Sequence, residues 1–468
     1  MKKTIIALFS ALALIGCAEK NPVLSIEGGQ IQGVKDGEVY SYLGIPYAAA
    51  PVGDLRWKEP QSVTPWSGVK VADHFGPAAP QAPHTPGKAY TSEFFFDGDP
   101  EFSEDCLYLN VWTKAPGKTS KKLPVAMWIH GGGFTGGWGF EPEMDGKEWA
   151  KKDVVLVTIN YRLGVFGFMA HPLLSAESGH NSSGNFGILD QVAALNWVHD
   201  NIAQFGGDPD NITIFGQSAG AGSVRTLVTS PLTGNLIKKA IIQSGGGVSE
   251  APALVDTDPQ AAGDATKAVF DWAGMDTLEK MRAASTDEVF NLADKYLKET
   301  GNRVRLSSSP FVDGYVMKET FEDATIGGRI KDIPYMIGYT MNDIPFLGVG
   351  IDSFCEYREK AGKPAYAYEF ARPLPDDEKG SHALKGAFHS SELWYTFKSL
   401  GNSDRPFGEQ DYVLADKMLD CWTSFVKTGK PGNGWEAYTK ANPKYMVFRF
   451  DASGNEASAM GDTVTKVD

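Results

Sequence analysis

The residues best suited to carry out chemistry surround a single serine. Ser218 stands in Gly216-Gln217-Ser218-Ala219-Gly220, the only Gly-x-Ser-x-Gly of the chain, although glycine fills 52 of 468 positions and the motif alone carries little weight. Its surroundings are more specific, because the apolar run 212–215 predicts a strand before it and 221–228 predicts a helix after it. A strand, a sharp turn and a helix form a nucleophile elbow, whose glycines permit the strained turn that exposes the serine hydroxyl. We therefore predict that Ser218 is a nucleophile.

A glycine-rich turn supplies candidate hydrogen-bond donors for an oxyanion. The sequence His130-Gly131-Gly132-Gly133-Phe134 directly follows the apolar run 125–129, which predicts another strand. Glycines leave the backbone N–H groups unobstructed, so such a turn can stabilise negative charge that develops during acyl transfer. We expect the oxyanion hole to consist of the N–H groups of Gly132, Gly133 and Ala219.

A serine hydroxyl needs a base to take its proton, and the chain offers two candidate histidines. On folds with a nucleophile elbow the order along the chain is serine, acid, histidine. Of the eight histidines, only His382 and His389 follow a suitable acid position. His382 lies in a charged, loop-like run, whereas His389 precedes an apolar helical pattern that can hold its ring still. We therefore predict that His389 is the base.

The carboxylate that orients this histidine should follow a late strand. Asp343 comes shortly after the apolar run 335–339 and meets this requirement. Asp313, in Val312-Asp313-Gly314, is typical of a turn. The expected triad is thus Ser218, Asp343 and His389.

The elements that position these residues alternate between short apolar runs and helical patterns. Such alternation predicts a mostly parallel sheet with helices on both faces and a ligand site beyond the carboxyl ends of the strands. With the elbow, this pattern predicts an α/β-hydrolase fold. Residues 23–45 favour an N-terminal antiparallel meander, and residues 258–300 favour a helical cap over the site. The expected core strands are 125–129, 154–159, 212–215, 240–243 and 335–339.

One predicted helix contains a charge on its apolar face. Residues 186–205 show helical periodicity, and Asp190 lies within the apolar stripe. A buried charge needs a partner, and we expect Arg162 to form a structural ion pair with it.

Composition excludes several classes of function. The chain has 44 basic and 58 acidic residues, which gives a net charge of −14 and makes nucleic-acid binding unfavourable. It contains no CxxC and no HExxH motif, so neither a metal nor another cofactor is expected. Nothing in the sequence indicates a protein partner.

The N-terminus predicts export. Lys2 and Lys3 precede an apolar run, residues 4–15, that is too short to span a bilayer. The following Leu14-Ile15-Gly16-Cys17 resembles a bacterial lipobox, which implies a diacylglyceride on Cys17; ordinary cleavage near Ala18 is the alternative. We expect a signal peptide at 1–16, a lipid-anchored tether at 17–22, one catalytic domain at 23–468, and a location on the periplasmic or cell-surface side of a membrane. Three cysteines then remain, enough for at most one disulfide.

Nearly the whole mature chain resembles the type-B carboxylesterases, the family of cholinesterases and bacterial para-nitrobenzyl esterases. The likeness includes Gly44-Ile45-Pro46-Tyr47-Ala48, the run from Ser103 to Val111, Asn160-Tyr161-Arg162-Leu163-Gly164 and the segment from Gly386 to Leu393. It implies a cofactor-independent ester hydrolase and, by position, the same triad.

Three departures from the family pattern bear on specificity. The acid is Asp343, where the family usually has Glu, and Gln217 replaces a frequent Glu beside the nucleophile. Ala79 stands where a cysteine usually pairs with the counterpart of Cys106, so the segment 80–105 lacks that cross-link. We expect packing by Phe94, Phe95 and Phe96 to order this segment around an open entrance.

The sequence thus predicts a serine esterase that acts through an acyl-Ser218 intermediate on neutral esters, including aromatic or sugar-linked ones. Aromatic and polar residues flanking the motifs are expected to contact the substrate: Phe134, Trp138, Gln217, Phe346 and Trp394. Two alternatives stay open, an amidase or thioesterase with the same machinery, and a catalytically weak binding or adhesion protein on the same fold.

Overall fold

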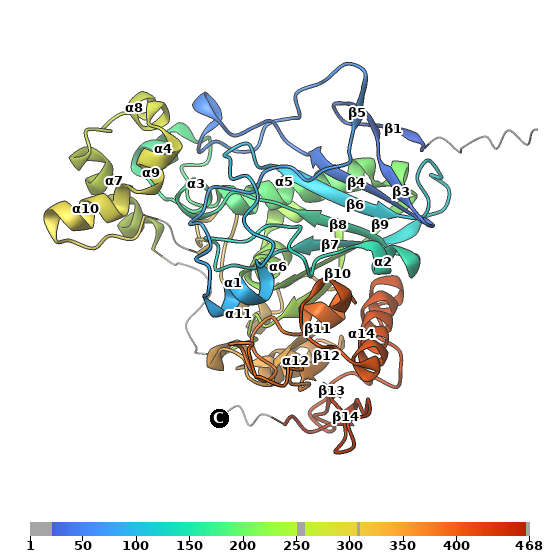
Figure 1. The fold of residues 1–468 in the computed structure, drawn as a ribbon. Helices are drawn as coiled ribbons and strands as arrows, with labels where there is room; N and C mark the ends of the chain where they lie inside the picture. The colour runs from blue at the N-terminus through green and yellow to red at the C-terminus, as the bar shows by residue number, and fades with distance from the viewer. Residues whose placement is uncertain (1–20, 250–257, 307–308, 465–468) are drawn as a thin grey trace, which may run out of the picture.

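The core of the molecule is a mixed sheet of eleven strands. A computed structural model describes residues 21–249, 258–306 and 309–464, so the predicted signal peptide and Cys17 lie outside the described residues. The strand order is β14-β13-β12-β11-β10-β9-β7-β8-β6-β4-β3, and pairing is parallel from β13 through β8 (Figure 1). The predicted α/β architecture is confirmed.

The five strands expected from apolar runs are present; four of them extend beyond the expected range, β9 the furthest, whereas β8 begins one residue later than expected. The sheet consists of β3 (Val34–Asp36), β4 (Val39–Pro46), β6 (Tyr108–Thr113), β7 (Leu123–Ile129), β8 (Val155–Ile159), β9 (Gly207–Gln217), β10 (Ile237–Gln243), β11 (Tyr335–Thr340), β12 (Tyr366–Phe370), β13 (Tyr445–Phe448) and β14 (Ala459–Gly461). A second small sheet holds β1 (Val23–Ile26), β2 (Gly29–Gln32) and β5 (Val69–Val71). The expected N-terminal meander is therefore divided, with β1 and β2 in the small sheet and β3 and β4 at the edge of the large one.

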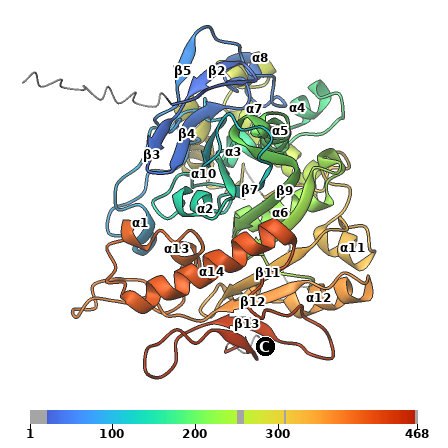
Figure 2. The same cartoon turned by 90° about the vertical axis from the view of Figure 1, so that its right-hand side faces the viewer.

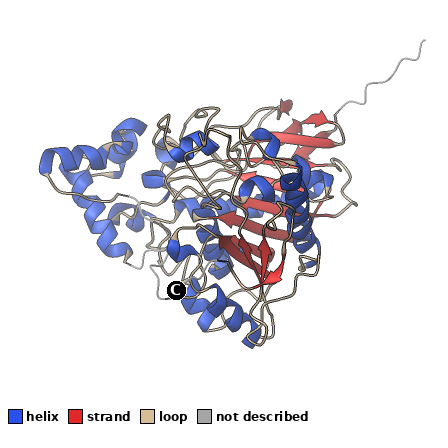
Figure 3. Cartoon of the chain, turned by 60° about the horizontal axis from the view of Figure 1, so that its bottom comes forward, coloured by secondary structure: helices blue, strands red, loops and turns tan. Residues whose placement is uncertain are grey.

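Helices cover both faces of the large sheet. The longer ones are α5 (Phe186–Asn201), α6 (Ala219–Thr229), α7 (Pro259–Trp272), α10 (Leu292–Thr300), α12 (Ile351–Lys360) and α14 (Glu409–Thr428). The short ones are α1 (Ala89–Phe94), α2 (Lys147–Lys151), α3 (Gly164–Gly167), α4 (Pro172–Glu177), α8 (Leu278–Ala283), α9 (Thr286–Phe290), α11 (Phe321–Ile326) and α13 (Leu393–Thr396). Figure 2 shows α14 running across one face, and Figure 3 shows the strands enclosed between helices.

Alternating side chains of the central strands explain the two layers. Along β7, Val125, Met127 and Ile129 pack into one apolar cluster, which includes residues of α5 and α6. Ala126 and Trp128 point to the other face and join the cluster that includes α13 and α14. The central strands are buried on both sides, as expected for parallel sheets between helices, whereas the edge strand β3 is exposed.

The predicted helical region 258–300 forms α7 to α10, which project as a lobe at one side of the molecule (Figure 1, yellow). Its apolar side chains pack with Trp57, Phe166 and Phe186 rather than with the main core. Within the described part of the chain, no helix combines the length and the hydropathy needed to cross a bilayer.

The predicted ion pair between α5 and the end of β8 is confirmed. Arg162 donates two side-chain hydrogen bonds to Asp190, at 2.8 and 2.7 Å, and its backbone N–H adds a third at 3.0 Å. Both side chains are almost fully buried. Because every contact is charge-assisted, the pair fixes the loop after β8 against α5.

Candidate active site

Ser218 occupies a strained turn between β9 and α6. Its backbone has φ 56° and ψ −122°, an unfavourable conformation for a residue with a side chain. The flanking glycines are required by space, since a Cβ at Gly216 would lie 2.7 Å from the carbonyl oxygen of Ile129 and one at Gly220 would lie 2.0 Å from the same oxygen. Glycine at these two positions lets the end of β7 approach the elbow.

The glycine-rich loop after β7 lies beside Ser218. A Cβ at Gly131 would meet the Ser218 Cβ at 3.2 Å, and Gly132 and Gly133 both have positive φ. Within the described chain, no hydrogen bond occupies the N–H groups of Gly132, Gly133 or Ala219. These three donors are therefore free to bind an oxyanion, in the positions that the sequence predicted.

The structure brings Asp343 and His389 together. His389 Nδ1 lies 2.6 Å from Asp343 Oδ1, while Ser244 Oγ donates to Asp343 Oδ2 at 2.6 Å. The backbone N–H groups of Thr340 and Ile344 also donate hydrogen bonds to the carboxylate of Asp343. Burial opposes a charge here, yet the hydrogen bonds, above all that of His389, hold the pKa of Asp343 below its ordinary value.

Backbone pairing explains why the histidine loop meets the acid. Asn342, next to the acid, donates its N–H to the carbonyl of Ala387 at 2.9 Å, and its side-chain oxygen accepts the N–H of Ala387 at 3.0 Å. The hydroxyl of Tyr90, in α1, donates to the carbonyl of His389 at 2.9 Å. The position of His389 is thus fixed both by the hydrogen bond to its backbone carbonyl and by the contact of its ring with Asp343.

The outer nitrogen of this imidazole faces a neutral amide. Gln217 Nε2 lies 3.2 Å from His389 Nε2 and 3.4 Å from Nδ1. A proton on Nδ1, assigned from the contact with Asp343, leaves a lone pair on Nε2 that the amide can meet. No hydrogen bond among the described residues joins Ser218 Oγ to this nitrogen, so the Gln217 amide must release the lone pair before Nε2 can take the serine proton.

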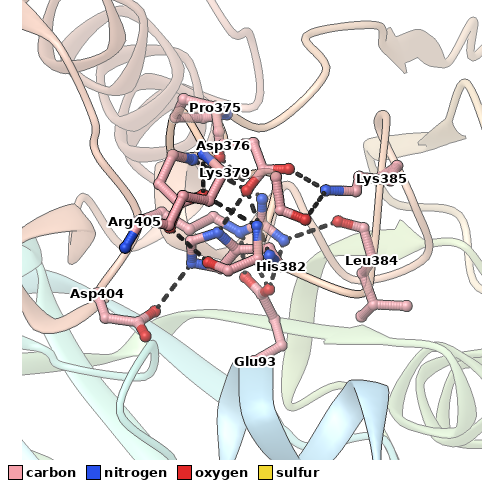
Figure 4. Close-up of polar contacts among 12 residues, drawn as sticks. Glu93, Pro375, Asp376, Lys379, His382, Leu384, Lys385, Asp404 and Arg405 are labelled. Carbon is pink, nitrogen blue, oxygen red and sulfur yellow. Dashed lines mark hydrogen bonds and ion pairs between the residues drawn. The ribbon is translucent and has the colours of Figure 1, made fainter.

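His382, the histidine that the sequence analysis set aside, lies in a surface cluster (Figure 4). Its Nδ1 is 2.7 Å from Asp376 and its Nε2 is 3.4 Å from Asp404. Asp313 is the expected turn residue, because its Oδ1 accepts the N–H groups of residues 315–317. Neither residue lines the cavity at Ser218.

That cavity has a volume of about 600 Å³. Most of the predicted substrate contacts are wrong. Of the five predicted substrate-binding residues, only Gln217 lines the cavity. Phe134, Trp138 and Trp394 are buried in the core, and Phe346 is partly exposed outside the cavity. Apolar side chains form the wall instead: Tyr90, Phe94, Phe95, Met144, Ile344 and Leu393.

Residues of α7 to α10 contribute nothing to the lining, so these helices do not cap this cavity.

The segment 80–105 is held by a buried ion pair, which the sequence analysis did not predict. Arg405 contacts Glu93 of α1 through Nε and Nη2, with a closest distance of 2.6 Å, and both side chains are at most 3% exposed. Arg405 also donates to the carbonyls of Pro375 and Leu384 (Figure 4). Aromatic packing accounts for only part of the order of this segment, because the side chain of Phe96 is 44% exposed. Cys106, Cys355 and Cys421 are buried free thiols, so the segment has no disulfide.

Several residues near the site escaped sequence reasoning. Ser244 contacts the acid but lies in a run of glycines without a recognisable motif. Glu392, three residues after His389, is buried, and its surroundings raise the pKa of its carboxyl to about 8. Glu141 and Glu143 line the cavity, although their sequence context resembles an exposed turn.

Fold and site together define an α/β-hydrolase: a serine at an elbow after β9, an acid after β11 and a histidine after β12 meet at the carboxyl ends of a mostly parallel sheet. Residues 20–347 and 341–464 match the model of the carboxylesterase family, and the chain belongs to that family.

Relatives of known activity agree. The chain is 34% identical to para-nitrobenzyl esterase of Bacillus subtilis, over 91% of this chain and 94% of the relative. It is 33% identical to fumonisin B1 esterase of Sphingopyxis macrogoltabida, over 88% and 83% respectively. The crystal structure of carboxylesterase EST55 from Geobacillus stearothermophilus superimposes with a TM-score of 0.75 at 32% identity, over 94% of this chain and 97% of that one. The protein is thus a serine carboxylic-ester hydrolase.

Proposed function

We propose that this enzyme hydrolyses esters through an acyl-Ser218 intermediate. The observation that carries the proposal is the short contact between His389 Nδ1 and Asp343, which leaves Nε2 as the base in the cavity that also contains Ser218. Nε2 takes the hydroxyl proton as Oγ attacks the ester carbonyl carbon, and the N–H groups of Gly132, Gly133 and Ala219 stabilise the oxyanion.

Collapse of the tetrahedral intermediate breaks the bond to the alcohol oxygen, which receives the proton from Nε2. A water molecule then gives its proton to Nε2 and attacks the acyl carbon, and Ser218 leaves with the proton restored. Asp343 stays ionised throughout and stabilises the imidazolium.

The test is the Ser218→Ala variant. We expect a loss on the order of 10⁶ in kcat on an aryl acetate, together with loss of labelling by an organophosphonate. Unchanged turnover in a correctly folded variant would refute the assignment of Ser218. Turnover by the wild type also discriminates an enzyme from a binding or adhesion protein, and matched amides and thioesters discriminate an esterase from the other acyl-transfer alternatives.

For the substrate, we propose neutral esters with aromatic or sugar-linked groups. The apolar wall formed by Phe94, Phe95 and Leu393 supports an aromatic group, and the neutral Gln217 beside Ser218 supports an uncharged one. The expected result is that aryl or sugar esters have a kcat/KM at least equal to that of choline esters with the same acyl chain. A choline preference of about tenfold that survives high salt would contradict this.

We also propose that the enzyme is an exported bacterial lipoprotein on the periplasmic or cell-surface side of a membrane. The lipobox-like Leu14-Ile15-Gly16-Cys17 supports this proposal. Wild-type protein should partition with detergent and membranes, whereas Cys17→Ala should be soluble. Mass spectrometry that finds an unmodified mature N-terminus at another residue would contradict the proposal.

A further inference from the structure

The base lies in a turn whose backbone is strained. The N–H of Ser391 donates to the carbonyl of Phe388 at 2.9 Å, so His389 and Ser390 are the two central residues of a turn. Only the second of them, Ser390, has a positive φ, of 76°. This combination is that of a type II turn, which favours glycine at the second central position. A serine there is strained, so its surroundings must stabilise the conformation.

A hydrogen bond from the cavity wall supplies this stabilisation. The hydroxyl of Tyr90 donates to the carbonyl of His389 at 2.9 Å. This carbonyl belongs to the peptide between the two central residues, and type I and type II turns differ mainly in the direction of that peptide. Rotation to a type I turn would relieve the strain of Ser390, but it would turn the carbonyl away from the Tyr90 hydroxyl. The hydrogen bond therefore favours the strained form of the turn.

Tyr90 is itself held in place by the contacts of its helix, α1. Glu93 pairs with Arg405, which also donates to backbone carbonyls of the loop that precedes the turn (Figure 4). Phe94 stacks on Trp394 of α13, which follows the turn, with ring centroids 5.8 Å apart. Figure 2 shows α1 beside α13. Helix α1 is thus joined to the chain on both sides of the turn, and this fixes the donor relative to its acceptor.

The same tyrosine forms part of the substrate cavity. Tyr90 lines this cavity together with His389 and Ser390, and its side chain is 40% exposed. A substrate that packs against the ring shields the hydrogen bond from water, which otherwise competes for the His389 carbonyl. One side chain therefore contributes to the wall and also sets the backbone of the base.

We propose that Tyr90 is a positioning residue, which holds the turn around His389 in the conformation that places the imidazole for catalysis. The inference rests on the proposed function, in which His389 is the base, and adds a residue that acts on the base through its backbone. A misplacement of a reacting group by about 1 Å can slow catalysis by about 10²-fold. Rotation of the peptide next to the base is therefore enough to impair proton transfer.

The test is the Tyr90→Phe variant, which keeps the aromatic wall and removes only the hydroxyl. We expect kcat on a neutral aryl ester to fall by about fivefold, which corresponds to about 1 kcal/mol, while KM changes by less than about twofold. Labelling of Ser218 by an organophosphonate should slow by the same factor, because it also needs the base. Tyr412→Phe is the matched control. Tyr412 is 41% exposed and lies outside the cavity lining, so its variant should keep both rates.

Substitutions of Ser390 distinguish positioning from other losses. Glycine adopts a positive φ without strain, so in a Ser390→Gly background the turn no longer needs the tyrosine. Tyr90→Phe should then reduce kcat by less than about twofold. Ser390→Ala removes the serine hydroxyl but keeps the strain, so in that background the reduction should remain about fivefold. A double-mutant cycle for each background measures this coupling.

Each outcome decides one question. Full activity of Tyr90→Phe, or an equal loss in the serine, glycine and alanine backgrounds, would refute the positioning role and leave the esterase intact. Failure of the wild type to turn over any ester would instead refute the proposed function. Circular dichroism checks the fold of each variant. If Ser390→Gly does not fold, Ser390→Asn takes its place, because asparagine also tolerates a positive φ.

Discussion

The side-chain amide of Gln217 lies 3.2 Å from Nε2 of His389, the nitrogen that must take the serine proton. Gln217 directly precedes the nucleophile, so the strained elbow places this amide against the base. Gln217 is neutral, so it adds no charge next to this nitrogen, whereas Asp343 contacts the other ring nitrogen at 2.6 Å.

Gln217→Glu should therefore change the pH dependence. A carboxylate next to Nε2 favours the protonated imidazole, which cannot act as a base. The acid limb of the kcat/KM profile should move to a pH higher by about 1, measured on a neutral aryl ester. Gln217→Met removes the amide without adding charge and is the matched control, with its acid limb unchanged. A limb that stays in place or moves to lower pH in Gln217→Glu would contradict the assigned geometry.

Asp343→Asn should preserve the fold and remove most of the activity. An amide can donate a hydrogen bond to Nδ1, which moves the ring proton to Nε2 and removes the lone pair needed there. A loss of about 10⁴ in kcat is expected, as for this change in other triads. The Asp376→Asn variant, which changes the partner of His382, should keep its activity on the same ester. Equal losses in the two variants would mean that Asp343 has no special role.

Local patterns predicted the elbow because its requirements are local. The strand, the two glycines and the helix around Ser218 are adjacent in sequence, and space alone demands glycine at both positions. Asp343 and His389 were predicted from chain order. Their meeting depends on the pairing of Asn342 with Ala387, which no periodicity reveals.

Two of the strands that the sequence analysis did not predict, β6 and β12, contain buried polar residues. Strand β6 includes Asn110, which accepts the N–H of Gly44 and donates to Thr158 inside the sheet. Strand β12 includes Glu369, which is fully buried and accepts the N–H of Val464. Such residues interrupt an apolar run, so the run looks too short for a core strand.

The substrate contacts were mispredicted because an aromatic side chain beside a motif can point in either direction. Trp394 stacks on Phe94 at 5.8 Å and donates to Glu93, which places it behind the cavity wall. Glu141 and Glu143 were missed for the opposite reason, since glutamates in a turn are usually solvated. Burial, which sequence alone does not give, decides both cases.

The ion pair between Glu93 and Arg405 should hold the segment 80–105 in place and so stabilise the folded protein. Arg405→Met leaves a buried carboxylate without its cation and should lower the free energy of unfolding by about 3–5 kcal/mol. The double variant Glu93→Leu/Arg405→Met should lose much less, because no charge is left unpaired. Urea denaturation measures both, with Lys267→Met in an exposed pair as the control that leaves stability unchanged. Equal losses in the single and double variants would show that the carboxylate does not need Arg405.

Glu392 should make the enzyme less stable as the pH rises. Burial, and then the negative charge of Asp343, raise the pKa of its carboxyl from 4.5 to about 8, while the unfolded chain keeps the ordinary value. Between these two values the folded state binds a proton that the unfolded state has released. The free energy of unfolding must therefore fall as pH increases, by up to about 1.4 kcal/mol per pH unit from this group.

Glu392→Gln removes this titration and so isolates it. The stability of the variant relative to the wild type should increase steadily from about pH 5 to pH 8 and become constant on either side of that range. Thermal or urea unfolding across the range measures the difference, and subtraction cancels the contributions of Glu141 and Glu143, which have the same sign. Glu101→Gln, an exposed glutamate, should follow the wild type at every pH. A difference that stays constant, or that shrinks with rising pH, would mean that Glu392 is ionised in the folded enzyme and that a donor compensates its charge.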